Sequence, residues 1–362
     1  MTLNSWFSSS YSEARTKFLA ACENRSIVMK SYLNPNAKGA QGEALYMDIA
    51  RIGPENASKV LLLISGTHGV EGYCGSGAQI GLLESGFFDD LAPDTSVMII
   101  HSLNPYGFSH DRRVNEDNID LNRNFINFES SFRPQTDYSK IHKALVPDEW
   151  DGPIRKAADE QLEKFIEEHG LTVFQAAISS GQYIYPDGLF YGGSSSSWSN
   201  SVLRELLNKH LAGIQSLAVI DFHTGLGPYG YGELITIGNK AQKDLSSRFY
   251  GEQVTDPEAG TSTSAQLNGM MANAIFELKS KTQISFVTLE FGTYEISMVL
   301  TALRGDNWLY QKAGLESPEA SAIKKDIRKA FYPDTDKWSK RVWSRTQDVV
   351  SLALGGLNTI SN

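Results

Sequence analysis

The sequence predicts an α/β fold in which a mixed, largely parallel sheet is covered by helices on both faces. Two observations carry this prediction. Four runs rich in Val, Ile and Leu are almost continuously apolar, which is typical of strands buried on both sides; they are Val60–Ser65, Val97–Ser102, Leu217–Phe222 and Ile284–Leu289. Helical patterns lie between these runs, and an alternation of strand and helix favours a parallel sheet.

The remaining elements follow from periodicity and from helix-end signals. Helices are expected at Glu13–Asn24, Gly75–Ser85, Arg155–His169, Val202–Leu211, Gln242–Glu252 and Ser264–Leu278. Gly170 and Gly213 each follow a helical pattern at a position that suits a helix C-cap. A fifth apolar run, Glu233–Gly238, is expected to form a strand near the sheet edge. From about Glu295 onward the pattern is mostly helical.

Length and composition favour one domain of ordinary globular character. The 362 residues are 41% hydrophobic and 21% charged, and no internal repeat or linker-like stretch divides them. We therefore expect a single domain over residues 1–362, in which a core at about 58–295 carries the site described below and a helical part at about 296–362 packs on it.

Charge and hydropathy exclude several classes of partner. The formal net charge of −9 argues against a nucleic-acid partner and against an anionic membrane surface. No stretch approaches the roughly 20 apolar residues of a membrane span. The first residues carry no signal-peptide pattern, and Cys22 and Cys74 form no disulfide framework. We expect a cytoplasmic protein with free thiols.

The first apolar run ends in a turn that carries a histidine and a carboxylate. His68 and Glu71 follow Val60–Ile64 in the stretch Ser-Gly-Thr-His-Gly-Val-Glu-Gly. Open α/β sheets place ligands at the carboxyl ends of their strands, and imidazole and carboxylate are ligands of zinc. Two ligands do not hold a metal, so a third is expected elsewhere.

The third apolar run supplies a matching histidine. His223 ends Ala-Val-Ile-Asp-Phe-His and precedes a glycine turn, as His68 does. His68, Glu71 and His223 would leave a fourth zinc position open, as in catalytic zinc sites. Asp221 alternates with His223 and could hydrogen-bond to a ligand. His101 also ends a strand and is a reserve ligand.

Two further features point to hydrolytic chemistry at the same sheet edge. Glu290 interrupts the fourth apolar run just before a glycine, where a buried carboxylate is costly unless it pairs or acts as a general base. The polar stretch 104–125 follows the second run and contains Arg112, Arg113 and Arg123, which could polarise a carbonyl or bind a substrate carboxylate.

Two other enzyme classes fit the sequence poorly. The glycines from Gly75 to Gly81 follow a strand, but their spacing is one residue too long for a dinucleotide-binding fingerprint, and no acidic ribose-binding strand end follows. No Gly-x-Ser-x-Gly elbow of a serine hydrolase occurs.

Taken together, the motifs resemble a known family. His-Gly-Val-Glu at 68–71, Asn-Pro-Tyr-Gly at 104–107, Asp-Leu-Asn-Arg-Asn-Phe at 120–125, and then His223 and Glu290, are similar in kind and order to the zinc carboxypeptidases of the carboxypeptidase A type. The short distance from the arginine pair to Asn122 is closer to the aspartoacylase and succinylglutamate desuccinylase branch. The whole chain resembles an uncharacterised bacterial group within that superfamily, which implies a zinc-carboxypeptidase-like fold.

The resemblance implies a role for each residue. One Zn²⁺ per chain would be bound by His68, Glu71 and His223, and Glu290 would be the general base and later the proton donor. Arg113 would polarise the scissile carbonyl. The substrate carboxylate would be bound by Asn122 and Arg123, while Arg112 competes with Arg113 for its position.

The function expected from these roles is zinc-dependent hydrolysis of an amide or peptide bond next to a free carboxylate. The substrate would be a small peptide or, in the alternative, an N-acyl amino acid cleaved by a deacylase of the aspartoacylase type. A metal-binding protein without catalysis is the second alternative. The mobile tyrosine of carboxypeptidases has no assignable counterpart; Tyr229, Tyr231 and Tyr294 are candidates. Side-chain specificity and oligomeric state do not follow from the sequence.

Overall fold

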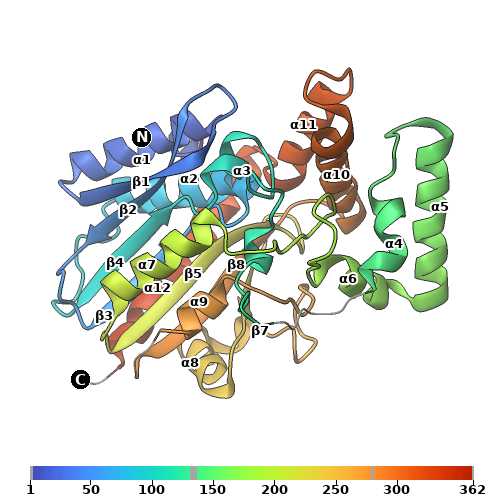
Figure 1. The fold of residues 1–362 in the computed structure, drawn as a ribbon. Helices are drawn as coiled ribbons and strands as arrows, with labels where there is room; N and C mark the ends of the chain where they lie inside the picture. Colours follow the sequence, from blue (N-terminus) through green and yellow to red (C-terminus); the bar gives the residue numbers. More distant parts are fainter. Residues whose placement is uncertain (1–2, 131–136, 279–280, 361–362) are drawn as a thin grey trace.

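A computed structural model describes residues 3–130, 137–278 and 281–360. Its centre is one eight-stranded sheet, seen in Figure 1, with the order β1-β2-β4-β3-β5-β8-β6-β7. The strands are β1 (Val28–Lys38), β2 (Ala44–Ile52), β3 (Lys59–Ile64), β4 (Thr95–His101), β5 (Ser216–Gly225), β6 (Gly232–Thr236), β7 (Val254–Thr255) and β8 (Gln283–Gly292). The central strands β4, β3, β5 and β8 are parallel, while β1, β2 and β6 pair antiparallel to their inner neighbours. The predicted mixed, largely parallel sheet is confirmed.

Twelve α-helices surround the sheet within the described ranges. They are α1 (Tyr11–Asn24), α2 (Gly72–Glu84), α3 (Pro105–Ser109), α4 (Tyr138–Leu145), α5 (Gly152–His169), α6 (Leu171–Ser179), α7 (Trp198–Leu211), α8 (Lys240–Tyr250), α9 (Ala272–Phe276), α10 (Ile296–Trp308), α11 (Ala320–Phe331) and α12 (Asp336–Asn358). Short 3-10 turns occur at Leu3–Ser5, Gly69–Glu71 (η2), Leu121–Arg123 (η3) and Gly251–Gln253, and a π-helical turn at Leu309–Ala313 extends α10.

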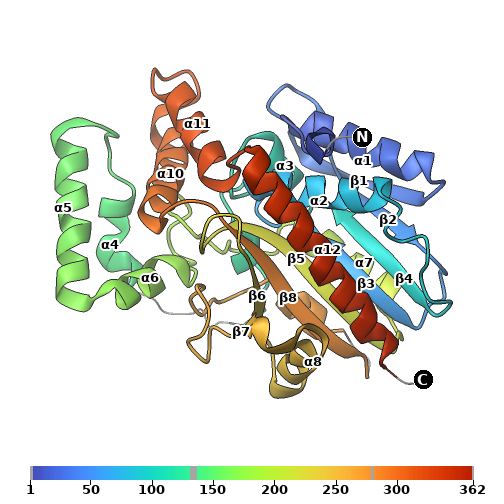
Figure 2. The same ribbon diagram turned by 180° about the vertical axis from the view of Figure 1, so that it is seen from behind.

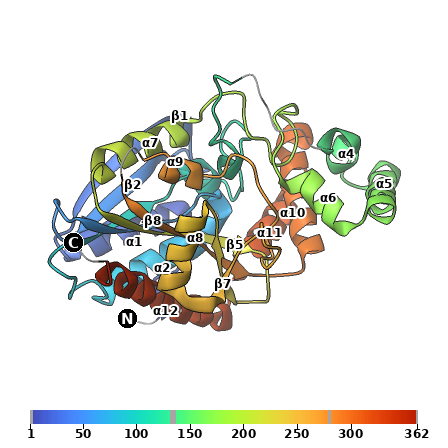
Figure 3. The ribbon, with the colours of Figure 1, turned by 90° about the horizontal axis from the view of Figure 1, so that it is seen from below.

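Both faces of the sheet are buried, which explains the continuous apolar strands. Leu61 and Leu63 of β3 belong to a core shared with α1, α2, α8 and α12, whereas Leu62 and its neighbours Val60 and Ile64 face a second core with α7 and α9. Figures 1 and 2 show these two helical layers on opposite sides, and Figure 3 shows the sheet between α7 and α12. Since every β3 side chain is out of water, alternation of polar and apolar residues is absent there.

A third apolar cluster covers the carboxyl ends of the central strands. It joins α4, α5 and α6 to α10 and α11, and it includes Val70 from the turn after β3. The C-terminal helices therefore pack on the turn that carries His68 and Glu71. Among the described helices, none is both long and apolar enough to cross a lipid bilayer.

The N-terminal hairpin of β1 and β2 was not predicted from the sequence. β1 is an edge strand whose side chains are mostly exposed, with Val28 at 80% and Leu33 at 49%. Because the side chains of this edge strand are at most partly buried, with few exceptions, its sequence contains no continuous apolar run. Its partner β2 buries a continuous stretch from Met47 to Ala50, but two charged residues interrupt its apolar pattern. Helices α4 and α6 were also not predicted.

The helix predicted at Ser264–Leu278 is wrong over most of its length. Only α9 (Ala272–Phe276) is helical there. The backbone before it bonds to distant segments instead of to itself: the Asn268 N–H donates to Ser180 O, and Gly269, with φ of +68°, accepts from the Phe125 N–H. Glu233 also accepts the Thr263 N–H. These tertiary hydrogen bonds outweigh the local helical pattern.

Candidate metal centre

The turn after β3 brings His68 and Glu71 to the edge of the sheet. His68 precedes η2, and Glu71 ends it. Backbone hydrogen bonds tie this turn to the loop that carries Arg112 and Arg113 (the arginine loop), because the Gly69 N–H donates to Arg113 O (3.1 Å) and the Val70 N–H to Arg112 O (2.8 Å). A Cβ on Gly69 would lie 2.0 Å from the backbone carbon of Gly107, so only glycine allows the turn to approach α3 this closely.

The third candidate ligand comes from β5, the parallel neighbour of β3. Asp221 of β5 is in register with Ile64 at the end of β3, and His223 lies two residues farther along β5. His223 is in turn in register with Glu290 on β8. The carboxyl ends of three adjacent parallel strands therefore supply two imidazoles and two carboxylates to one edge of the sheet.

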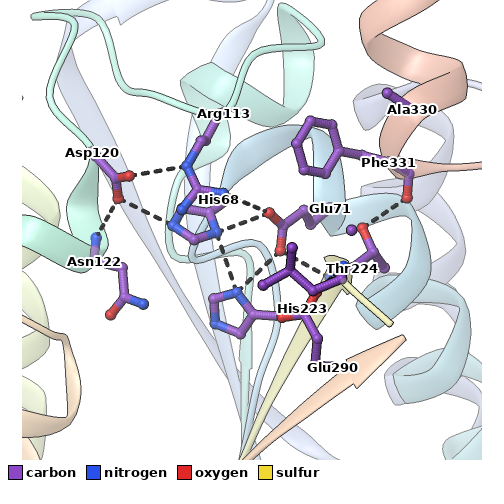
Figure 4. A network of polar contacts seen from close by, with 12 residues as sticks. His68, Glu71, Arg113, Asp120, Asn122, His223, Thr224, Glu290, Ala330 and Phe331 are labelled. Atoms are coloured by element: carbon purple, nitrogen blue, oxygen red, sulfur yellow. Dashed lines mark hydrogen bonds and ion pairs between the residues drawn. The ribbon is translucent and has the colours of Figure 1, made fainter. Parts of the chain in front are cut away.

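The ligand atoms of His68, Glu71 and His223 converge on one point (Figure 4). The Nδ1 atom of His68 lies 2.9 Å from Glu71 Oε1, and the Nδ1 atom of His223 lies 3.0 Å from Glu71 Oε2. The two Nδ1 atoms are 3.1 Å apart. Two ligands of a tetrahedral ion at bond lengths of about 2.0–2.1 Å lie about 3.3 Å apart. The three residues thus have the spacing of a metal triad.

Each histidine uses its other ring nitrogen to contact an aspartate. His68 Nε2 lies 3.1 Å from Asp120 Oδ1, and His223 Nε2 lies 2.7 Å from Asp221 Oδ2. Because a carboxylate accepts the proton of the nitrogen it contacts, both Nδ1 atoms are left with lone pairs directed at the cluster. Two ring nitrogens and a carboxylate that converge in this way form a donor set that fits a metal ion such as zinc.

The cluster is almost fully buried, and its charges are balanced locally. His68, Glu71 and His223 are at most 3% exposed. Burial by itself would raise the pKa of Glu71, but the adjacent His68 and His223 more than offset the burial and leave that pKa lowered. The Thr224 N–H also donates to Glu71 Oε2 (3.0 Å). Glu71 is therefore held as a carboxylate, the form that binds metal.

Arg113 lies at the edge of this cluster. Its Nε donates to Asp120 Oδ2 (2.9 Å), and its Nη1 donates to Glu71 Oε1 (3.2 Å), as Figure 4 shows. Within the part of the chain that the structure describes, its Nη2 has no protein acceptor. The guanidinium is thus fixed at two points and keeps donors for a third group.

Glu290 projects from β8 beside His223. Glu290 is 7% exposed, and its carboxylate accepts the Leu226 N–H at 2.9 Å. Burial raises the pKa of Glu290, and the nearby charge of Glu71 raises it further. A buried glutamate with a raised pKa, next to a candidate metal triad, can hold or release a proton near neutral pH.

The other predicted residues are distributed differently. Arg112 points away from the cluster: its Nε donates to Asp306 Oδ2 (2.9 Å), and its Nη2 to Asn118. Arg123 is 2% exposed, and its guanidinium donates to the carbonyls of Ser179 and Asn122. Burial lowers its pKa to about 10. The structure therefore brings Arg113, and not Arg112, to the triad.

The reserve ligand and the candidate tyrosines lie elsewhere. His101 stacks on Phe18 with ring centroids 4.4 Å apart and bonds to Ser76 Oγ, so it is not part of the triad. Tyr229 contacts Thr335 through its hydroxyl and Tyr294 through its ring. Tyr231 is 49% exposed. The structure gives none of the three a contact with the described triad.

A comparison with models of protein families shows the family to which this chain belongs. Residues 7–345 match the model of a family described as "Protein of unknown function (DUF2817)". The chain belongs to this family. A comparison with curated proteins gives no significant match.

Several solved structures resemble this DUF2817 protein at low identity. Bovine thrombin-activatable fibrinolysis inhibitor, in complex with tick carboxypeptidase inhibitor, is 13% identical with a TM-score of 0.45; the match covers 93% of this chain and 97% of that one. Carboxypeptidase A from Helicoverpa armigera is 15% identical with a TM-score of 0.44, covering 94% and 73%. A succinylglutamate desuccinylase from a Silicibacter species is 16% identical with a TM-score of 0.40, covering 84% and 65%. These likenesses are too distant to assign an activity.

One residue that the sequence interpretation left out is central to this site of the DUF2817 protein. Asp120 contacts His68, Arg113 and the Asn122 N–H, and it is fully buried. The stretch 104–125 contains many polar side chains of equal standing, so spacing alone does not single out Asp120. The sequence feature that marks Asp120 is its place in Asp-Leu-Asn-Arg, two residues before Asn122.

Proposed function

We propose that this DUF2817 protein is a zinc-dependent hydrolase that cleaves an amide or peptide bond next to a free carboxylate. The observation that supports the proposal most is the convergence of His68, Glu71 and His223 with their aspartate partners, next to Glu290 and Arg113. Metal ligands alone would serve a structural site as well, but a buried glutamate and a guanidinium with remaining donors are the groups that hydrolysis requires.

His68, Glu71 and His223 would hold one zinc ion per chain. When bound, zinc supplies Lewis-acid chemistry, since it polarises a carbonyl oxygen and makes water more acidic. Asp120 and Asp221 fix the orientation of the two imidazoles and keep their Nδ1 atoms unprotonated.

Glu290 would move the proton of the reaction. As a carboxylate it accepts a proton from the attacking water, and as an acid it returns this proton to the leaving nitrogen. Its raised pKa suits this exchange, because a group with a pKa near the working pH is effective in both directions. The Leu226 N–H holds one carboxylate oxygen and so leaves the other available.

The arginines would orient the substrate. Arg113 would direct its Nη2 donors at the carbonyl oxygen and stabilise the negative charge that develops there. Asn122 and Arg123 would bind the substrate carboxylate. Arg123 is buried and bonded to two backbone carbonyls, so its charge has no carboxylate directly paired with it among the described residues. A substrate anion would neutralise that buried charge.

The experiment compares Glu290→Gln with the wild-type protein and with Glu233→Gln. Glu233 is a matched control, because it is a buried glutamate in register with Glu290 on the adjacent strand β6 and accepts hydrogen bonds from Thr255 and Thr263. A panel of short peptides and N-acyl amino acids first identifies which class is hydrolysed. We expect Glu290→Gln to keep its zinc and to lose about 10²- to 10⁴-fold in kcat, while Glu233→Gln stays close to wild type.

The outcomes separate the alternatives. Equal hydrolysis by wild type and Glu290→Gln would remove Glu290 from the mechanism. Hydrolysis of N-acyl amino acids but not of peptides would select the deacylase alternative. Zinc in the purified protein without hydrolysis of either class would favour a metal-binding protein that is not an enzyme.

A further inference from the structure

We propose that Phe190 limits the size of the side chain that the substrate carries beside its free carboxylate. The inference rests on the proposed function, since it takes Arg113 as the group that meets the carbonyl oxygen and Arg123 as the group that meets the carboxylate. It adds a residue that neither the motifs nor the metal triad involves.

The ring of Phe190 contacts both arginines. Its centroid lies 5.2 Å from Cζ of Arg113 and 5.4 Å from Cζ of Arg123. A substrate that bridges the two guanidiniums must therefore pass along this ring. In such a substrate the amide nitrogen and the carbon that bears the side chain join the scissile carbonyl to the free carboxylate, so this side chain is the part of the substrate next to Phe190.

Little space remains beside the ring. Phe190 is 9% exposed, and a cavity of ≈ 20 Å³ lies along its ring on the side of Arg113, lined also by Leu189, Leu303, Arg112 and Asp306. That volume holds about one water molecule. A hydrogen or methyl group fits there, whereas a benzyl group requires the ring to be removed or displaced.

The backbone holds Phe190 in an unfavourable conformation for its residue type. Its φ is +52°, in the left-handed region that bulky residues rarely adopt. The segment is fixed on both sides: the Leu189 N–H donates to the hydroxyl of Tyr138 (2.7 Å), and Phe190 O accepts the Gln182 N–H (3.1 Å). The Asp120 N–H donates to Tyr191 O, which links this segment to the site. Backbone strain of this kind is retained where the surrounding structure holds a side chain in one defined position.

The test measures binding of four dicarboxylates to the purified, metal-containing protein by calorimetry. Succinate, methylsuccinate, isobutylsuccinate and benzylsuccinate share two carboxylates, one for the metal triad and one for Arg123, and differ in the group beside them. We expect wild type to bind methylsuccinate at least about ten-fold more tightly than benzylsuccinate, and Phe190→Ala to reduce this ratio by at least about ten-fold.

A matched control accounts for the loss of a buried ring. Phe249→Ala removes a phenyl ring of similar burial, 4% exposed, from α8 in the core on the other side of the sheet. We expect it to lower Tm while leaving the selectivity ratio unchanged. Phe190→Gly should be more heat-stable than Phe190→Ala, because glycine adopts the positive φ without strain.

The two possible failures can be told apart. If the dicarboxylates bind and Phe190→Ala keeps the wild-type ratio within two-fold, Phe190 does not set the size limit and the inference is overturned, while the proposed function stands. If no dicarboxylate binds wild type although the metal is present, the carboxylate site itself is wrong, and the inference fails with it.

Discussion

Asp120 provides the sharpest test of the metal centre, because one buried carboxylate contacts two groups with different tasks. Its Oδ1 lies 3.1 Å from Nε2 of the proposed ligand His68, and its Oδ2 accepts from Nε of Arg113 at 2.9 Å. In Asp120→Asn one oxygen still accepts from His68, but the new amide places N–H donors against the Arg113 donor. The variant therefore loses a negative charge near the cation and the ion pair of Arg113.

The expected size of the effect follows from these contacts. Removing the hydrogen-bond partner of a metal-bound histidine costs about 10- to 100-fold in metal affinity, or about 1.4–2.8 kcal/mol. Asp221→Asn makes the corresponding change beside His223, whose contact with Asp221 is 2.7 Å. Both variants should weaken zinc binding by an amount in this range. Only Asp120→Asn should also lower kcat after full zinc loading, because it alone frees Arg113.

The assay is competition for zinc between each protein and a chelator of known affinity. Glu233→Gln is the control, since Glu233 is a buried carboxylate that accepts hydrogen bonds from Thr255 and Thr263 and has no histidine partner among the described residues. Its zinc Kd should stay within two-fold of wild type. If the zinc Kd of Asp120→Asn also stays within two-fold, the aspartate does not tune the ligand and the reasoning from tautomer and charge is refuted.

Three further predictions concern the frame around the site. Gly69→Ala should destabilise the protein by about 3 kcal/mol or more in urea unfolding, because the added Cβ meets the backbone of Gly107 at 2.0 Å; unchanged stability would contradict the close approach. Burial lowers the pKa of His101 to about 4, below its unfolded value of about 6.5, so this residue contributes stability that is complete above pH 6.5 and is lost as the pH falls through 4. His101→Phe should therefore reduce the loss of unfolding free energy between pH 7 and pH 4 by about 3 kcal/mol, and an unaltered pH profile would count against it. Burial raises the pKa of Cys22 to about 12 and that of Cys74 well above its usual range, so a thiol reagent should label neither in the native protein and both after denaturation; rapid native labelling would disprove their burial.

The elements that the sequence predicted well are those buried on both faces. The strands β3, β4, β5 and β8 are continuous apolar runs because helices cover both sides of the sheet, and the pattern carries that information directly. The hairpin β1–β2 escaped prediction because one side of its edge strand faces water. The false helix at 264–278 shows the opposite failure, since its helical pattern is overruled by hydrogen bonds to Ser180, Phe125 and Glu233.

The residues at strand ends were predictable for a similar reason. A histidine or glutamate that terminates an apolar run is conspicuous, and parallel strands end at one edge, so His68, His223 and Glu290 could be grouped from the sequence. Asp120 could not, because it stands in a loop without periodicity, where its neighbours are equally polar. What selects it is contact with His68 across 52 positions of the chain.

The choice between Arg112 and Arg113 depends on a partner that no local pattern reveals. Adjacent residues in a loop direct their side chains to different sides, so one of the two arginines must leave the site. Arg112 leaves because Asp306 of α10, 194 positions away, accepts its Nε, and because the ring of Tyr310 lies 3.7 Å from its Cζ. The C-terminal helices therefore do more than cover the strand ends. By binding Arg112 they fix which guanidinium reaches Glu71, so the arrangement of the site depends on a contact between two residues that are 194 positions apart in the chain.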